Sequence, residues 1–235
     1  MKDLFGDIFG RPIGIVIFQL LEATQFTVYL SLIAFLGGGL LGLVIMTIRI
    51  GRNPTGRKLA GAYIWTFQSV PLLMLLFLMG LGVPRLLAID VNPWFAATTA
   101  LIIYTSAYLS DVWRGAIEAI PSGQWDAGRA LGLRFLQMLR LVIIPQAVRL
   151  SLAPTVGFMV QIIKGTSLAY IIGFHDLMSI GKRWSNAPVD GTEPFIVFPM
   201  MALIYFALCF PLSAWSRHLE RKLGGKDKRT VVAAG

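Results

Sequence analysis

Polar side chains interrupt the long apolar stretches of this 235-residue sequence at few positions, and each is a candidate for contact with a small polar solute. Gln68 and Ser69 stand just before Pro71, whose ring removes a backbone hydrogen bond and can free a carbonyl toward a cavity. Hydrogen bonding between helices explains these two residues equally well.

A second candidate group has helical spacing. Tyr104, Tyr108 and Asp111 follow i, i+4, i+7 and would share one helix face, where a carboxylate could meet a substrate ammonium. Arg114 lies three residues after Asp111, so we favour an intrahelical ion pair as the interpretation of these two charges.

A third group surrounds a predicted break in a helix. Lys164, Thr166 and Ser167 combine an ammonium, two hydroxyls and free backbone N–H groups, which together suit a carboxylate. A structural hinge whose lysine snorkels to the interface explains the same residues. Gln161, about one turn earlier, would point the same way.

Catalysis and metal binding are not indicated. His175 and His218 are too far apart to form a metal site, and Cys209 lies in an apolar run as a small hydrophobic residue. His175 and Asp176 are expected to form a surface pair. No set of nucleophile, base and acid falls on one predicted face, and no G-x-x-x-x-G-K-[ST] loop is present to hold phosphates. We therefore expect no catalytic residue and no metal.

The composition is that of an integral membrane protein. The chain is 56% hydrophobic and 14% charged, with a mean hydropathy of +0.70, whereas soluble domains are about a quarter charged. Several runs approach the ~20 apolar residues that cross a bilayer. We predict an all-α polytopic fold with a transmembrane domain over residues 23–216. Its five expected spans are residues 24–48, 60–81, 94–112, 147–163 (followed by a short helix 167–181) and 195–215.

The 21 lysines and arginines predict the topology. Most of them fall on one side of the membrane if the 49–58 loop, the polar segment 121–145 and the basic tail 217–235 share it. That side is predicted to be cytoplasmic, with the C-terminus there and the N-terminus outside. Residues 1–22 are interpreted as an amphipathic segment lying on the membrane. The net charge of +9 thus fits a lipid surface, and no nucleic acid is expected.

The polar segment 121–145 is unusual, because a loop between two spans needs only a few residues. Ser122 is predicted to cap a helix, Gly132 to end it in a left-handed conformation, and Pro145 to close the unit. Such a segment is suited to be held by a cytoplasmic partner. A second short helix would present one apolar face, formed by Phe135, Leu136, Met138, Leu139 and Val142.

This segment resembles the coupling motif of ABC importer permeases, in which EAA, three residues, Gly and nine residues precede I-x-LP. The sequence here has Asp126-Ala127-Gly128, Gly132 and Val142-Ile143-Ile144-Pro145 at the same spacing, with mild substitutions. AYLSDVWRGAIEAIPSGQ, IIPQAVR, KGTSL and SVPLLMLLF further resemble the polar amino-acid permease family, over roughly residues 20–220. Two departures, Gln68 where the family usually has Arg and Gly157 where Asn is common, concern the substrate and leave the fold unchanged.

The resemblance implies a permease subunit of an ATP-driven importer with the type I permease fold, in the bacterial cytoplasmic (inner) membrane. This chain would bind no cofactor, and a cytoplasmic ABC ATPase dimer would hold ATP and Mg. A second permease subunit, identical or paralogous, and an extracytoplasmic amino-acid-binding protein are the other implied partners besides membrane lipid. The residues implied in ATPase coupling are Gln124, Asp126, Ala127, Gly128, Arg129, Ala130, Gly132 and Pro145.

Two other function classes were weighed. A self-contained secondary transporter or channel for small polar solutes needs no partner-shaped segment, and no inverted repeat is visible in the sequence. A membrane-embedded enzyme would need the convergent catalytic set that the sequence lacks.

Overall fold

The computed structural model describes residues 11–224, and every regular element within them is helical. The predicted all-α class is confirmed for this part. Residues 1–10 of the expected interfacial segment and residues 225–235 of the expected basic tail lie outside it. The α-helices are α2 (Arg11–Ile50), α3 (Pro54–Ser69), α4 (Leu72–Phe77), α5 (Val83–Leu87), α6 (Pro93–Glu118), α7 (Ser122–Ala130), α8 (Phe135–Met138), α9 (Ile144–Thr166), α10 (Leu177–Ser185) and α11 (Pro194–Gly224). Two π-helical segments, η1 (Leu78–Gly82) and η2 (Leu139–Ile143), and a 3-10 segment, η3 (Ser167–Ile172), complete the set.

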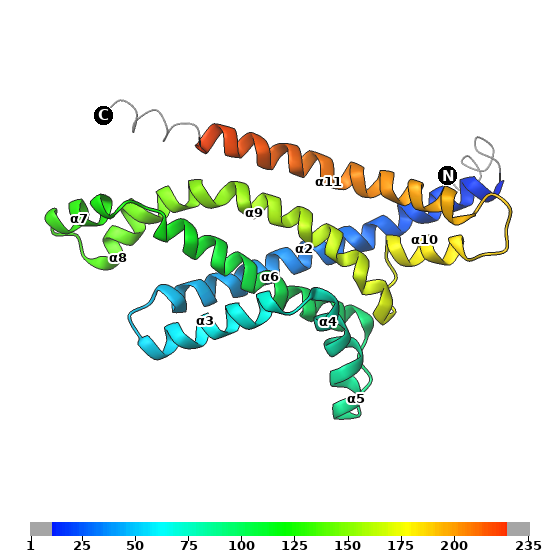
Figure 1. Ribbon diagram of the computed structural model, residues 1–235, viewed down its shortest axis with the longest axis horizontal. Coiled ribbons are helices and arrows are strands. Elements are labelled where there is room, and N and C mark those ends of the chain that lie inside the picture. Colours follow the sequence, from blue (N-terminus) through cyan, green and yellow to red (C-terminus); the bar gives the residue numbers. More distant parts are fainter. Residues whose placement is uncertain (1–10, 225–235) are drawn as a thin grey trace.

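Long helices lie along the greatest dimension of the molecule, with α6 in the middle (Figure 1). Three helices of the described part are long and apolar enough to cross a membrane: Pro12–Ile50, Phe135–Ile172 and Pro194–Leu223. A fourth crossing is available if the bent pair of Pro54–Ser69 and Leu72–Leu87 counts as one span. The remaining expected span corresponds to α6, which has 26 residues and a length of about 39 Å. Helix α6 is not among the three helices above, and it carries several serines, threonines and tyrosines between its apolar residues.

Within the described residues no break in the helix marks the expected boundary between an N-terminal segment 1–22 and a first span beginning at residue 24. Residues from Arg11 to Ile50 form one continuous helix of 40 residues. Glu22 and Gln25 are exposed on its surface and do not interrupt it, because neither residue removes a backbone donor. At about 60 Å this helix is twice as long as the hydrocarbon core is thick.

Pro71 breaks the second span, as predicted. Helix α3 ends at Ser69, and Val70 takes an extended conformation with φ −85° and ψ 126°. A residue before proline is driven out of the helical region by contact with the pyrrolidine ring. The chain therefore turns by 100° between α3 and α4, and Figure 1 shows α4 and α5 projecting away from the long helices.

In the core, α2 packs directly against α6 at positions where α2 has small residues. A Cβ added to Gly42 would lie 3.1 Å from the carbonyl oxygen of Ser106, and one added to Gly38 would overlap Thr105. These glycines let the two backbones approach closely. Around this contact Leu30, Leu101 and neighbouring apolar side chains are fully buried. The outer faces of the long helices leave many large apolar side chains exposed, as expected of a surface that faces lipid or another subunit.

Candidate functional site

Helix α7 forms the first part of the polar segment, beginning directly after Pro121. Ser122 is its first residue and does not cap it, so the predicted role of Ser122 is wrong. Pro121 takes the N-cap position with φ −53° and ψ 140°, and no side chain accepts from the first turn. The fixed φ of proline already supplies the entry geometry that a cap residue would provide.

The end of α7 is a Schellman motif, which confirms the predicted stop at Gly132. Gly132 has φ +72°. The Leu133 N–H donates to the Gly128 carbonyl at 3.1 Å and the Gly132 N–H donates to the Arg129 carbonyl at 2.9 Å. These two bonds satisfy carbonyls that the helix end would otherwise leave free, and they fix the direction in which the chain leaves α7.

Gly128 lets α7 lie close to α8. A Cβ added at Gly128 would come within 2.7 Å of the Met138 sulfur, and both residues are buried. Trp125 of α7 stacks on Phe135 of α8 with ring centroids 6.4 Å apart. The two short helices therefore form one packed unit, in which Gly128 serves a steric purpose.

Pro145 does not close this unit, contrary to the prediction. Helix continues from Phe135 to Ile172 through the π-helical segment η2. The Ile144 N–H donates to the Leu139 carbonyl, five residues back, and this wider turn makes room for the proline ring that follows. The same arrangement occurs at η1, where the Val83 N–H donates to Leu78 and Pro84 follows. Helix α8 is thus continuous with α9 through η2.

The outer surface of the unit combines charge with apolar side chains. Asp126 pairs with Arg129, and Gln124 accepts from Gln146 at 3.3 Å, which links α7 to α9. Other exposed positions of α7 are small, namely Ala127 and Ala130.

Two leucines at the tip of this unit were not identified as surface residues from the sequence. Leu131 is 79% exposed and Leu136 is 74% exposed. Leu136 therefore leaves the predicted apolar face, whose other members Phe135, Leu139 and Val142 pack on buried Met138. Both leucines are therefore available for contact with another protein.

The predicted intrahelical pair forms on α6. Arg114 donates to Asp111 at 2.7 Å and also pairs with Glu118. Gln68 of α3 donates to the same Asp111 carboxylate at 3.4 Å. Ser69 donates to the Trp65 carbonyl of its own helix at 2.8 Å. Gln68 and Asp111 thus link α3 to α6, in agreement with the helix-to-helix interpretation.

Tyr104 and Tyr108 share one face of α6, as their spacing predicted. Their rings lie 4.7 Å apart, and Tyr108 stacks on Phe158 of α9 at 5.2 Å. Both side chains are half-buried. They form an aromatic contact between α6 and α9.

The predicted break at residues 164–167 begins later and is milder than expected. Helix α9 runs to Thr166 and passes directly into η3, which ends at Gly173 with φ +86°. Thr166 is buried and donates to the Ile163 carbonyl, and the Ser167 hydroxyl donates to the Lys164 carbonyl. Because the helix continues, no row of free N–H groups is available there for a carboxylate.

Lys164 itself is exposed and lies apart from Tyr104 and Tyr108. It lines a cavity of about 430 Å³ between α9 and α11, together with Tyr205, Ser213 and Arg217. Gln161 is also exposed on α9. Among the described residues no hydrogen bond connects Lys164 with Tyr104. The structure therefore divides the candidate path residues into an α3–α6 group and an α9 group.

Asp176 is a buried acid, which corrects the expected surface pair with His175. Asp176 is 0% exposed while His175 is exposed. Its carboxylate accepts from the Ser179 N–H at 2.9 Å and so caps α10. Burial raises the pKa of Asp176 to about 6, because the protein interior solvates the charged carboxylate less well than water does, while backbone hydrogen bonds partly offset this effect. The position of Asp176 just before a short helix was the signal in the sequence for its capping role.

Comparison with known proteins identifies the family. Residues 34–225 match the family model described as binding-protein-dependent transport system inner membrane component. The chain is 32% identical over 194 residues to a probable glutamine ABC transporter permease protein, GlnP, of Bacillus subtilis (strain 168), covering 83% of this chain and 88% of the relative. It is 30% identical over 216 residues to a probable amino-acid ABC transporter permease protein, YckA, of the same organism, covering 92% and 94%.

Solved structures agree with this result. A chain from the crystal structure of an amino acid ABC transporter with histidines has a TM-score of 0.79 and 28% identity, covering 87% of this chain and 94% of that one. A chain of the MetNI methionine ABC transporter in inward-facing conformations has a TM-score of 0.66 at 19% identity, covering 85% and 95%, and shows the fold alone. The type I permease fold expected from the sequence is confirmed. The chain belongs to the family of inner membrane components of binding-protein-dependent transport systems, and is a multi-pass inner membrane protein.

Proposed function

We propose that this chain is the membrane-spanning permease subunit of an ATP-driven ABC importer and forms part of the translocation pathway for a polar amino acid. The observation that carries the proposal is the α7–α8 unit, with its exposed charged and leucine surface continuous with a long apolar helix. The amino-acid class is supported by the names of the relatives, which are permeases of amino-acid transporters.

The mechanism assigns no catalysis to this chain. An ABC ATPase dimer on the cytoplasmic side holds ATP and Mg and contacts α7, with Leu131 and Leu136 as apolar anchors. Closure of the ATPase dimer moves α7. That motion passes to α9 without a flexible joint, because η2 keeps the helix continuous across Pro145. A second permease subunit and an extracytoplasmic amino-acid-binding protein complete the assembly, with the N-terminus of this chain outside.

The solute path follows the exposed side of α9. In the half of α9 that leads to η3, the exposed polar side chains are Gln161 and Lys164, and Lys164 is suited to a substrate carboxylate. Thr166, Ser167 and the Gln68–Asp111 contact instead have structural roles, since their polar atoms are satisfied within the protein.

The test is ATP hydrolysis by the assembled transporter in nanodiscs, with its ATPase, its sister permease if one exists, and its binding protein. Asp126→Lys should abolish the increase in hydrolysis that the loaded binding protein causes, while the variant still inserts. Arg149→Glu, an equal change of two charges at an exposed position of α9, is the matched control and should retain the increase. Normal coupling in Asp126→Lys would contradict the proposal. Identification of the ligand carried by the purified binding protein tests the substrate class.

A further inference from the structure

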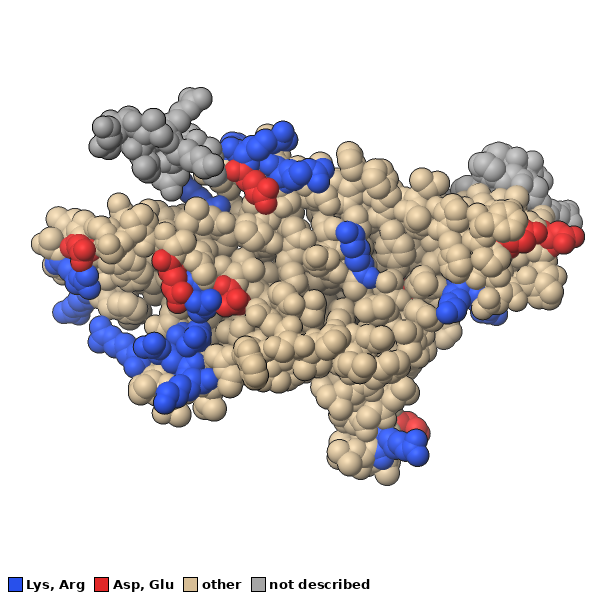
Figure 2. Space-filling model, viewed as in Figure 1, with Lys and Arg blue, Asp and Glu red and all other residues tan. Residues whose placement is uncertain are grey.

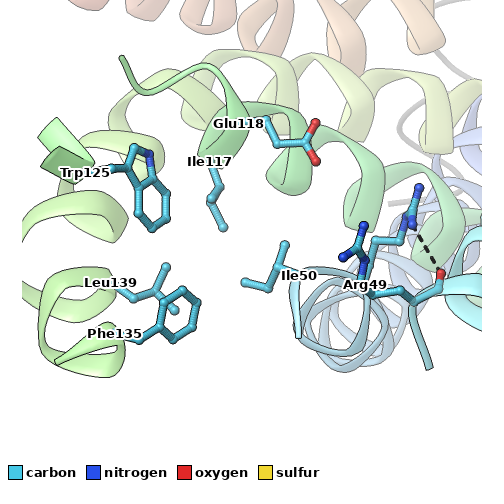
Figure 3. A pocket seen from close by; sticks show the side chains of 8 residues that line it. Arg49, Ile50, Ile117, Glu118, Trp125, Phe135 and Leu139 are labelled. Atoms are coloured by element: carbon cyan, nitrogen blue, oxygen red, sulfur yellow. Dashed lines mark hydrogen bonds between the residues drawn. The ribbon is translucent and has the colours of Figure 1, made fainter. Parts of the chain in front are cut away.

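The end of the molecule that carries α7 contains a basic cavity of about 380 Å³, between the α2–α3 turn, the end of α6 and the α7–η2 unit. Figure 3 shows Trp125 and Phe135 on one side, Arg49 on the other, and Ile50 and Ile117 between them. Two aromatic rings, two aliphatic side chains and a guanidinium thus surround one space. Nothing in the transport mechanism above uses this cavity.

The cavity has an excess of positive charge. Arg49 and Arg57 line the cavity. The Arg52 guanidinium lies over the ring of Phe135, another lining residue, at 5.3 Å from the ring centroid. Among residues 11–224 none of these three arginines forms an ion pair with a carboxylate. Glu118 also lines the cavity, but Arg114 already pairs with it. Figure 2 shows basic side chains gathered over this end of the molecule. The chemistry therefore suits an anion such as a phosphate.

An apolar slot adjoins the basic cavity. It has a volume of about 360 Å³ and shares Ile117 as a common wall. Leu43 and Met46 line it on α2, about one to two helical turns before Arg49, and Trp113 lines it on α6. The slot therefore extends from the basic cavity toward the centre of α2, which is the apolar part of the span.

We propose that the two cavities form one site for an anionic phospholipid of the inner leaflet. The phosphate lies among Arg49, Arg52 and Arg57, and an acyl chain passes Ile117 into the slot beside Trp113. A free phosphate would leave the slot unused, and a neutral lipid would leave the arginine charges unpaired. The slot at membrane depth also favours a lipid over an acidic segment of a partner protein. The inner leaflet follows from the proposed orientation, whereas the site itself does not depend on transport.

The experiment uses the full chain in its assembled transporter, in phosphatidylcholine nanodiscs with increasing phosphatidylglycerol brominated on its acyl chain. Bromine quenches a nearby tryptophan. Because the chain has six tryptophans, the difference between the wild type and Trp113→Phe isolates the signal from the slot. Brominated phosphatidylglycerol should quench this signal at a lower mole fraction than brominated phosphatidylcholine does.

Arg57→Gln should reduce the preference for the anionic lipid roughly fivefold, the usual effect of one basic residue near a lipid surface. Its neighbour Lys58 is equally exposed on α3 but does not line the cavity, so Lys58→Gln is the matched control and should retain the preference. The Arg57 side chain makes no hydrogen bond among the described residues, so the variant should fold, and retained ATPase co-purification checks this.

Four results would overturn the proposal. Equal quenching by the two lipids would show that charge is not recognised, and equal losses in Arg57→Gln and Lys58→Gln would show a general surface effect. Displacement of the brominated lipid by millimolar soluble glycerol phosphate, or absence of quenching in the assembled complex, would assign the site to a free anion or to a partner subunit. None of these results bears on coupled ATP hydrolysis, so the proposed function is tested separately.

Discussion

Gly132→Ala tests whether the turn after α7 maintains the shape of the coupling segment. Gly132 has φ +72°, and a Cβ there would meet nothing within 4 Å. The cost of alanine is therefore backbone strain alone, about 1–2 kcal/mol for an L-residue in the left-handed region. A change of this size raises the population of the open turn roughly 5- to 30-fold.

Hydrogen exchange measures this opening directly. The Leu133 N–H is held by the Gly128 carbonyl at 3.1 Å, so its exchange requires the turn to open. We expect exchange at Leu133 to be roughly 5- to 30-fold faster in Gly132→Ala, together with weaker stimulation of ATP hydrolysis. Gly123→Ala is the matched control, because Gly123 also has open space around it but lies within α7 with an ordinary helical φ. An unchanged exchange rate at Leu133 in Gly132→Ala, or an equal acceleration in Gly123→Ala, would show that the backbone conformation of Gly132 does not control opening of the turn.

Three further predictions concern packing, pH and the solute path. Gly38→Val should lower the free energy of unfolding of the purified protein by about 1–3 kcal/mol in a melting assay, because the Cβ of valine would overlap Thr105. Gly39→Ala should have little effect in the same assay, because a Cβ at Gly39 has ordinary contact distances. Because burial raises the pKa of Asp176 from 3.8 to about 6, the folded state binds this proton more tightly than the unfolded state does. The free energy of unfolding contributed by this proton should be greatest below about pH 4 and should be lost as the pH rises from 3.8 to about 6, by up to about 3 kcal/mol in all. Melting curves between about pH 3.5 and 7 should lose this pH dependence in Asp176→Asn, and an identical dependence in that variant would contradict the assignment. Lys164→Ala should impair amino-acid uptake into proteoliposomes while ATPase co-purification is retained, and unchanged uptake constants would leave the lysine a structural role only.

The parts of the fold that follow from local backbone rules could be predicted from the sequence. Pro71 ends α3 because the residue before a proline is excluded from the helical region. Gly132 ends α7 because only glycine adopts positive φ at low cost. The close approach of α2 to α6 likewise follows from the glycines of α2, since small residues permit helices in lipid to approach one another. Each of these rules depends on one or two residues and on nothing distant.

The parts that depend on tertiary packing could not be predicted. Burial of Asp176 requires α2, η3 and α10 to meet around it, and the exposure of Leu131 and Leu136 depends on how α8 packs beneath α7. The helix across Pro145 was missed for another reason, because a π-helical turn accommodates a proline that would otherwise end the helix. The candidate path residues separated into two groups because spacing along one helix says nothing about which neighbouring helix covers it.

Site-specific photo-crosslinking can show whether the end of α7 contacts the ATPase subunit. A photoreactive residue would replace Leu131, the exposed leucine at the end of α7, in the transporter assembled with its ATPase. A second variant would carry the same group at Leu86, which is equally exposed but lies on α5, far from α7 (Figure 1). We expect crosslinks from position 131 to the ATPase subunit that change in yield on addition of ATP, and none from position 86. Absence of any crosslink from position 131 to an ATPase, or crosslinks from it to an extracytoplasmic protein, would contradict the proposed contact between α7 and the ATPase.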